Sequence, residues 1–173
     1  MDSSLLDKAS LPNAGAGLYA VILPTPIGNL GIQTRDNILS RIDFLPQGIS
    51  FAAPPQNALT RHICQQLKHY FQHPHHRFDI EIKLEGTPFQ KRVWEALRRI
   101  PAGITVSYKI LAEQLETSPR AIGNACRANP IPVVIPCHRI VAKDHIGGYS
   151  GKRAGDMLDI KKWLLQHEKM QPA

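Results

Sequence analysis

Cysteine is scarce in this chain of 173 residues, which holds three: Cys64, Cys126 and Cys137. No two of them have the CxxC spacing of a zinc site or a redox pair. So few cysteines argue against a disulfide framework and against a structural zinc site. We therefore expect free thiols, no metal ion and no cofactor.

Long apolar runs are also missing. The stretch 18–23 is as long as a strand and far shorter than a membrane span. The first ten residues carry Asp2 and Asp7 and lack the basic and apolar pattern of a secretory leader. We expect a cytoplasmic protein that has no membrane partner.

Residues 1–85 lack any excess of charge, because seven Lys and Arg side chains balance seven Asp and Glu side chains. Residues 86–173 hold 14 basic and 7 acidic side chains, so the whole net charge of +7 lies there. Such asymmetry is typical of a protein half that binds nucleic acid, and solubility alone would not explain a neutral first half. We expect two domains, 1–85 and 86–173.

The first half has the pattern of a small mixed α/β unit. Segments rich in strand formers are broken by turn residues, and one stretch has apolar residues at helical spacing. Strands are expected at 18–23, 28–33, 38–45 and 78–84, and a helix at 59–71. Four histidines between residues 69 and 76 surround Pro74. We interpret them as polar surface and not as a metal site.

The second half is mainly helical. Thr87-Pro88-Phe89-Gln90 combines a capping hydroxyl, a proline at the first helical position and a capping-box glutamine, so it predicts a helix start. Further helices are expected at 107–115, 118–127 and 157–167. The first of these should turn Ile110 and Leu111 inward. Because only two residues separate it from the next, the pair predicts a helix-turn-helix.

The second helix of that pair has small side chains at Ala121, Gly123, Asn124, Ala125 and Ala128. A helix with little side-chain bulk can approach a narrow surface closely. We therefore expect it to enter the minor groove of DNA and not the roomier major groove. Arg120 and Arg127 flank it.

Cys137 lies in a setting that indicates chemistry. It is followed by His138 and Arg139, and the prolines of residues 130–136 predict a stiff, extended approach. The thiolate is the reactive form of cysteine, and adjacent positive charge stabilises it. The alternative is a buried cysteine that acts as a small hydrophobic residue. The neighbouring motifs favour a nucleophile.

Glu168 falls at the C-terminal end of the last predicted helix, where the helix dipole disfavours a carboxylate. A nearby cation would compensate for this placement. The candidates are Lys169, which is next in sequence, and a protonated His138.

Seven short motifs occur in one order: Thr87-Pro88-Phe89-Gln90, Ser107-Tyr108, Arg120-Ala121-Ile122-Gly123-Asn124-Ala125, Asn129-Pro130, Ile135-Pro136-Cys137-His138-Arg139, Gly148-Tyr149-Ser150-Gly151 and Trp163-Leu164-Leu165-Gln166-His167-Glu168. Together they resemble the O6-alkylguanine-DNA alkyltransferases, or methylated-DNA–protein-cysteine methyltransferases. The resemblance is strong over 86–168 and weaker over 17–85. It implies a ribonuclease-H-like α/β N-terminal domain, followed by a mainly α domain with a winged or helix-turn-helix DNA-binding motif.

The resemblance also implies catalytic roles. Cys137 matches the alkyl acceptor, His138 the base that acts through a water, and Glu168 the carboxylate that orients this base. Asn129 matches the asparagine that braces the turn before the cysteine loop. Tyr108 matches the tyrosine that helps to rotate the nucleotide and protonates the leaving guanine.

The partner that the resemblance implies is double-stranded DNA, bound through its minor groove with the alkylated guanine flipped out. Arg120 matches the arginine finger that fills the gap left by this base. The remaining matches are Ser107, Ala121, Asn124 and Arg127 on the DNA side, and Ile135, Tyr149 and Ser150 around the base. We expect a monomer that repairs O6-alkylguanine, with O4-alkylthymine as a second candidate. Since nothing here could cleave the thioether product, each molecule should act once.

Two other functions stay open at this point. A non-catalytic lesion sensor would bind the same DNA, but such proteins replace the acceptor cysteine, which this chain retains. A thiol hydrolase could use Cys137 with His138. However, adjacent side chains of an extended segment point to opposite sides, and a hydrolase leaves the basic helix pair unexplained.

Overall fold

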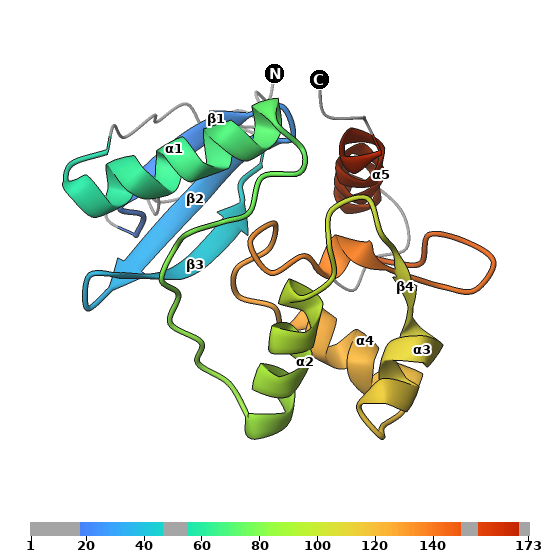
Figure 1. The fold of residues 1–173 in the computed structure, drawn as a ribbon. Helices are drawn as coiled ribbons and strands as arrows, with labels where there is room; N and C mark the ends of the chain where they lie inside the picture. Colours follow the sequence, from blue (N-terminus) through green and yellow to red (C-terminus); the bar gives the residue numbers. More distant parts are fainter. Residues whose placement is uncertain (1–17, 47–54, 150–155, 170–173) are drawn as a thin grey trace, which may run out of the picture.

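The computed structural model describes residues 18–46, 55–149 and 156–169. Its elements form two groups (Figure 1). A three-stranded sheet and α1 (Ala58–Gln72) lie above, with α5 (Asp156–Glu168) beside them. The helices α2 (Pro88–Arg98), α3 (Tyr108–Gln114) and α4 (Pro119–Arg127) lie below. A short 3-10 turn, η1 (Cys137–Arg139), lies between the two groups and packs against α5 and α2.

The sheet is an antiparallel meander of β1 (Val21–Thr25), β2 (Gly28–Arg35) and β3 (Ile38–Phe44). Asp36 and Asn37 form the two-residue loop between β2 and β3, with φ of 53° and 60°. This left-handed pair is what a type I′ hairpin needs, and Asp and Asn tolerate it well. The three strands predicted at 18–23, 28–33 and 38–45 are confirmed, with small shifts at their ends.

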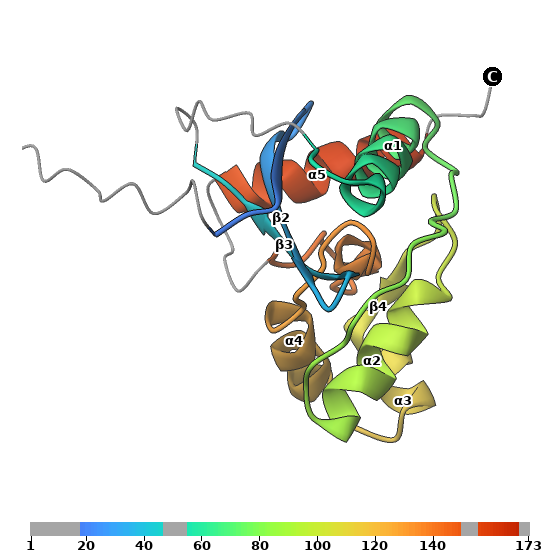
Figure 2. The same ribbon diagram turned by 90° about the vertical axis from the view of Figure 1, so that its left-hand side faces the viewer.

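Helix α1 covers one face of the sheet (Figure 2) and buries Ile63, Cys64, Leu67 and Tyr70. Its N-cap is Asn57, whose Oδ1 accepts a 2.9 Å hydrogen bond from the Thr60 N–H. The helix predicted at 59–71 is confirmed. One cluster of buried apolar side chains runs from the sheet through α1 to α2, α4 and the segment 131–140.

The strand predicted at 78–84 is wrong. This segment forms no ladder and meets the sheet only at an isolated bridge between Ile82 and Leu39. The alternation arises because Ile80 is buried in the core while Asp79 and Glu81 face outward. The alternation of buried and exposed side chains therefore resembled that of a strand, although this segment makes no ladder of hydrogen bonds.

Helix α2 begins as its sequence predicts. Thr87 Oγ1 accepts a hydrogen bond from the Gln90 N–H at 3.1 Å, and Gln90 Oε1 accepts one from the Thr87 N–H at 2.9 Å. The indole N–H of Trp94 donates to the Ala125 carbonyl at 2.9 Å, which fixes α2 against α4.

The helices α3 and α4 pack together across a tight turn. Ser107 and Ser118 cap them, as predicted. Glu116 has φ of 53°, and the N–H groups of Glu116 and Thr117 donate to the Glu113 and Ala112 carbonyls. These two bonds make a Schellman motif, with glutamate where glycine is usual.

Some details around α3 differ from expectation. Ile110 is 48% exposed, so its predicted inward orientation is wrong; Leu111 and Ala112 are the buried residues of this short helix. Val106–Ser107 and Ile140–Val141 form the parallel two-residue strands β4 and β5, which are too short to leave a periodic pattern.

Helix α5 confirms the helix predicted at 157–167. Within the three described ranges, no helix has both the length and the apolar character needed to cross a bilayer.

The Thr87 cap can be tested directly. Thr87→Ala removes the hydroxyl that accepts the Gln90 N–H and should lower the free energy of unfolding by about 1 kcal/mol. Chemical denaturation would measure the change. Thr87→Ser keeps the acceptor and is the control, so an equal loss in both variants would contradict the capping role.

Candidate active site

The loop before Cys137 is a turn and not the extended approach that its prolines predict. Val133 has φ of 73°, a left-handed conformation that β-branched residues rarely adopt. The Ile135 N–H closes the turn by donating to the Ile131 carbonyl at 2.8 Å. Buried packing holds Val133, which is 1% exposed. The turn returns the chain toward the C-terminal end of α4. Cys137 therefore lines the same cavity as Cys126 and Arg127 of that helix.

Asn129 joins the end of α4 to the cysteine. Its Nδ2 donates to the Ile135 carbonyl at 2.8 Å and to Cys137 Sγ at 3.1 Å, and its Oδ1 accepts from the Ile131 N–H at 3.0 Å. Its backbone N–H donates to the Cys126 carbonyl at 3.2 Å. One side chain thus fixes both the turn and the sulfur that follows it.

Cys137 lines a cavity of about 690 Å³ although its side chain is only 5% exposed. The cavity lies between α3, α4 and the loop 142–149. Its other walls include Tyr108, Arg120, Gly123, Asn124, Cys126, Arg127, Gly147 and Tyr149. Gly147 has φ of 75°, and a Cβ there would lie 3.1 Å from the Tyr108 ring. The sulfur therefore faces a space large enough for a flat ligand, beside the two helices of the pair.

Burial raises the pKa of Cys137. The Asn129 hydrogen bond, the charge of Lys161 and the nearby Tyr149 hydroxyl oppose this effect, in that order. The thiol is thus surrounded by groups that favour its anion, within an apolar site that disfavours it.

His138 and Glu168 form a buried pair. His138 Nε2 lies 2.8 Å from Glu168 Oε1, and both side chains are at most 1% exposed. Burial lowers the pKa of His138, while Glu168 opposes this shift. A carboxylate only accepts hydrogen bonds, so the neutral imidazole carries its proton on Nε2. Nδ1 is then a free acceptor, and within the described part of the chain it has no hydrogen-bond partner.

The sequence predicts that Arg139 stabilises the Cys137 thiolate, but its guanidinium binds Glu168 and the Ile100 carbonyl instead. Its Nε lies 3.0 Å from Glu168 Oε2 and its second guanidinium nitrogen 2.8 Å from Oε1, while the third binds the Ile100 carbonyl. The 3-10 turn separates adjacent side chains and directs Arg139 away from the sulfur. His138 and Arg139, not Lys169, are therefore the cations or donors that hold Glu168. Together they lower the pKa of this carboxyl group far below its usual range.

Lys161 is a residue of the site that sequence reasoning missed. It lies on α5 with 0% exposure, and its Nζ donates to the Ile140 and Gly148 carbonyls at 2.6 and 2.9 Å. The Nζ atom also lies 6.0 Å from the centre of the Tyr108 ring. Burial lowers the pKa of Lys161 to about 8. The sequence did contain one signal for it, because a lysine lies on the apolar face of α5 between Ile160 and Leu164.

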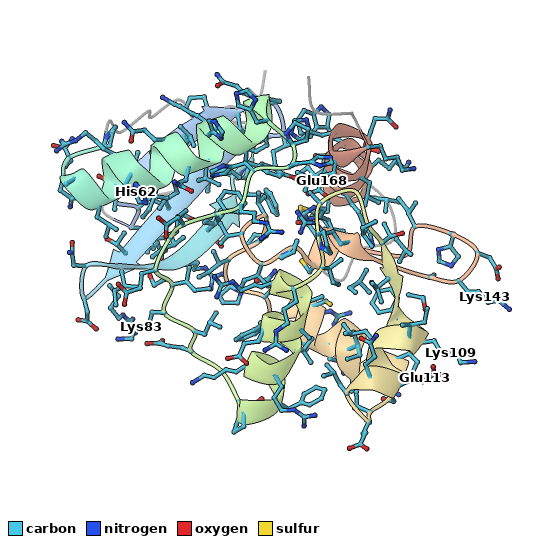
Figure 3. All side chains as sticks on the ribbon, viewed as in Figure 1. His62, Lys83, Lys109, Glu113, Lys143 and Glu168 are labelled. Atoms are coloured by element: carbon cyan, nitrogen blue, oxygen red, sulfur yellow. The ribbon has the colours of Figure 1, made fainter. Side chains whose placement is uncertain are left out.

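The other predicted residues fall into two groups. Arg120, Asn124 and Arg127 are exposed on α4, Ala121 is half-buried beside them, and Ser107 caps α3. Ile135 and Tyr149 are buried close to Cys137. Ser150 lies outside the described residues. The labelled Lys109, Glu113 and Lys143 lie at the periphery in Figure 3, whereas Glu168 lies inside, near the end of α1.

The histidines of residues 69–76 lie at the end of α1 and in the loop that follows. His69 Nδ1 is 3.0 Å from His76 Nδ1, and His76 Nε2 is 2.8 Å from Gln66 Oε1. In the ranges that the structure covers, no group of three or more His, Cys, Asp or Glu side chains could hold a metal ion.

The fold and the site define a small α/β protein in which Cys137 lines a cavity and the next residue, His138, forms a buried pair with Glu168. Residues 88–170 match the family model described as 6-O-methylguanine DNA methyltransferase, DNA binding domain. The methylated-DNA–protein-cysteine methyltransferase of Methanosarcina barkeri is 36% identical over 157 residues, which cover 87% of this chain and 97% of that protein. The constitutive enzyme of Bacillus subtilis is 33% identical, covering 88% and 96%.

A solved structure agrees with these relatives. The OGT of Mycobacterium tuberculosis in complex with DNA is 34% identical, with a TM-score of 0.71, and the match covers 86% of this chain and 91% of that one. Its shared fold has a small N-terminal sheet and a helical C-terminal part. This chain belongs to the methylated-DNA–protein-cysteine methyltransferase family.

The buried charge of Lys161 should make stability depend on pH. Its folded pKa of about 8 lies below the ordinary 10.5, so between these values the unfolded chain binds more protons and stability rises with pH. From pH 8 to pH 10 the free energy of unfolding should rise by about 2 kcal/mol relative to Lys161→Met. Denaturation at several pH values would measure it. Lys162→Met, at an exposed neighbour, should leave the wild-type slope, and a flat difference for Lys161→Met would refute this account.

Proposed function

We propose that this chain repairs DNA by moving the alkyl group of O6-alkylguanine to its own Cys137, once per molecule. The observation that carries the proposal is the placement of Cys137 Sγ. It lines the cavity beside α3 and α4 and is held by Asn129 at 3.1 Å, in a chain that belongs to the methyltransferase family. O4-alkylthymine presents a similar alkyl–oxygen bond and is the second candidate substrate.

In the proposed reaction His138 is the base. Its imidazole is neutral, Glu168 fixes the tautomer, and Nδ1 is free to take the thiol proton through a water. The thiolate attacks the alkyl carbon, a carbon–sulfur bond forms, and the bond from that carbon to guanine O6 breaks. Asn129 supports this step by donating a hydrogen bond to the sulfur, which favours the anion.

The electron pair of the broken bond goes to the guanine, which needs a proton. Tyr108 lies across the same cavity, and burial raises its pKa to about 12. Its hydroxyl therefore remains protonated at neutral pH and can donate a proton to the leaving guanine. Ile135 and Tyr149 are assigned to the proposed base pocket, and Ser150, which lies outside the described residues, is assigned to it from the family resemblance alone.

The proposed DNA interface is the exposed face of α4, with α3 and α4 acting as a helix-turn-helix in the minor groove. Arg120, Asn124 and Arg127 recur along that face at helical spacing, with Ala121 between them and Ser107 at the start of α3. Because the cavity opens next to this face, a base rotated out of the duplex would reach Cys137 directly. Arg120 would then fill the gap in the duplex.

The two regions of the chain have different roles in this reaction. Residues 86–173 form the alkyl-transfer domain, and residues 1–85 form a ribonuclease-H-like α/β domain that supports it. One bound molecule provides every group of the proposed site, so a monomer suffices.

Alkyl transfer can be tested by mass spectrometry. Incubation with an O6-methylguanine duplex should add one CH2 unit to the intact mass, and peptide mapping should place it on Cys137. Cys137→Ala should gain nothing, whereas Cys64→Ala, altered in the α1 core, should still be modified. Transfer by Cys137→Ala would refute the assignment. Binding of the damaged duplex with no mass change in the wild type would indicate a lesion sensor.

The effect of replacing Arg120 should depend on whether the substrate is duplex DNA or the free base. Arg120→Ala removes the side chain that would occupy the gap, and unstacking a base costs a few kcal/mol, so transfer from duplex DNA should slow by about tenfold or more. Transfer from the free O6-alkylguanine base should keep its rate. Arg61→Ala, an exposed change on α1, is the charge-matched control. Equal slowing with both substrates would contradict a role in base flipping.

A further inference from the structure

Glu168 receives a hydrogen bond from a part of the chain that the proposed reaction does not use. The Tyr70 hydroxyl donates to Glu168 Oε1 at 2.7 Å. The same oxygen faces His138 Nε2 at 2.8 Å and Arg139 at 2.8 Å, while Oε2 faces Arg139 Nε at 3.0 Å. Tyr70 and His138 therefore share one carboxylate oxygen, and the shared atom couples them.

The Tyr70 ring is held firmly in place. It has 0% exposure and contacts the rings of Phe71, Phe78 and His167, with centroids 5.3, 5.4 and 5.3 Å away. Its backbone carbonyl accepts a 2.8 Å hydrogen bond from His167 Nε2. His167 precedes Glu168 in α5, so two successive residues of α5 are bound to one residue of α1. The hydroxyl is thus presented to Glu168 by a rigid support.

We propose that Tyr70 is a positioning residue for alkyl transfer, which acts through Glu168 to set the orientation and the proton affinity of His138. This inference rests on the proposed function of Cys137. A phenol that donates to Oε1 withdraws negative charge from the oxygen that His138 faces. The imidazolium is then less strongly stabilised, so His138 stays neutral and ready to accept the thiol proton.

The Tyr70 hydroxyl has a part distinct from that of Arg139 and of the Gly103 N–H, which donates to Oε2 at 3.5 Å. Arg139 alone contacts both oxygens and could draw the carboxylate toward itself. The Tyr70 hydroxyl approaches Oε1 from α1, so it opposes that rotation and keeps this oxygen opposite His138. Helix α1 therefore contributes to the proposed active site as well as to the core, although Tyr70 lies 98 residues from Glu168 in the sequence.

Tyr70→Phe tests the proposal because it deletes only the hydroxyl and keeps the ring contacts. In single-turnover assays on an O6-methylguanine duplex, the first-order rate of transfer should fall by about tenfold, the equivalent of one hydrogen bond to a charged group. The DNA dissociation constant should not change. Since the carboxylate becomes more basic, the acid limb of the rate–pH profile should move to higher pH. A merely structural role would not move that limb.

The matched control is Tyr19→Phe. Tyr19 also donates to a carboxylate in the first half of the chain, Asp43 Oδ2 at 3.0 Å, and it is not among the residues that line the cavity of Cys137. This variant should keep the wild-type rate and pH profile. An unchanged rate and profile in a folded Tyr70→Phe protein would overturn the inference, even though wild-type transfer continued. Absence of transfer in the wild type would instead refute the proposed function.

A second replacement covers the case in which Tyr70→Phe does not fold. Incorporation of 3-fluorotyrosine at position 70 keeps the hydroxyl and makes it a stronger donor. The acid limb should then move to lower pH, opposite to the shift expected for phenylalanine. A shift in the same direction, or no shift, would contradict the proposed coupling through Glu168.

Discussion

One buried carboxylate organises this protein. Glu168 is 1% exposed, and an ionised group at that depth is tolerated only when hydrogen bonds and opposite charge replace water. Its side-chain donors come from two places in the sequence, Tyr70 on α1 and the pair His138 and Arg139 on the turn that carries Cys137, while α5 supplies Glu168 itself. The need to satisfy this charge therefore fixes where α1, η1 and α5 meet, and with them the position of Cys137.

The rest of the site compensates for a second difficulty, which is a thiol placed in an apolar environment. Burial disfavours the thiolate, yet the proposed chemistry requires it. Asn129 and Lys161 offset part of this effect, and each also holds backbone carbonyl groups of the loops around the sulfur. The left-handed Val133 shows how tightly the approach loop is constrained, because the surrounding core must balance the cost of that conformation. Positioning of the sulfur and tuning of its charge thus rely on the same few side chains.

Much of the fold could be predicted from local chemistry. Thr87, Ser107 and Ser118 mark helix starts by cap residues alone, and the Asp36-Asn37 pair marks a hairpin. The segment 78–84 was mistaken because alternation reports burial and not hydrogen bonding. The turn at Val133 was missed because prolines limit φ at their own positions while packing decides the residue between them. Cys137, His138 and Glu168 could be selected from sequence, but Tyr70 looks like an ordinary member of an amphipathic helix, and Lys161 shows only as a lysine on the apolar face of one. Only the long-range packing of α1 and α5 brings them to the site.

The order of these residues along the chain bears on how the protein is made. Ribosomes deliver the sequence from the N-terminus, so Tyr70, His138 and Arg139 emerge before the acidic partner that all three require. Until α5 has left the exit tunnel, a guanidinium and an imidazole in the nascent chain have no anion to bury against and should remain hydrated. The buried pairing beside Cys137 can then form only after Glu168 itself has emerged and α5 can pack against η1.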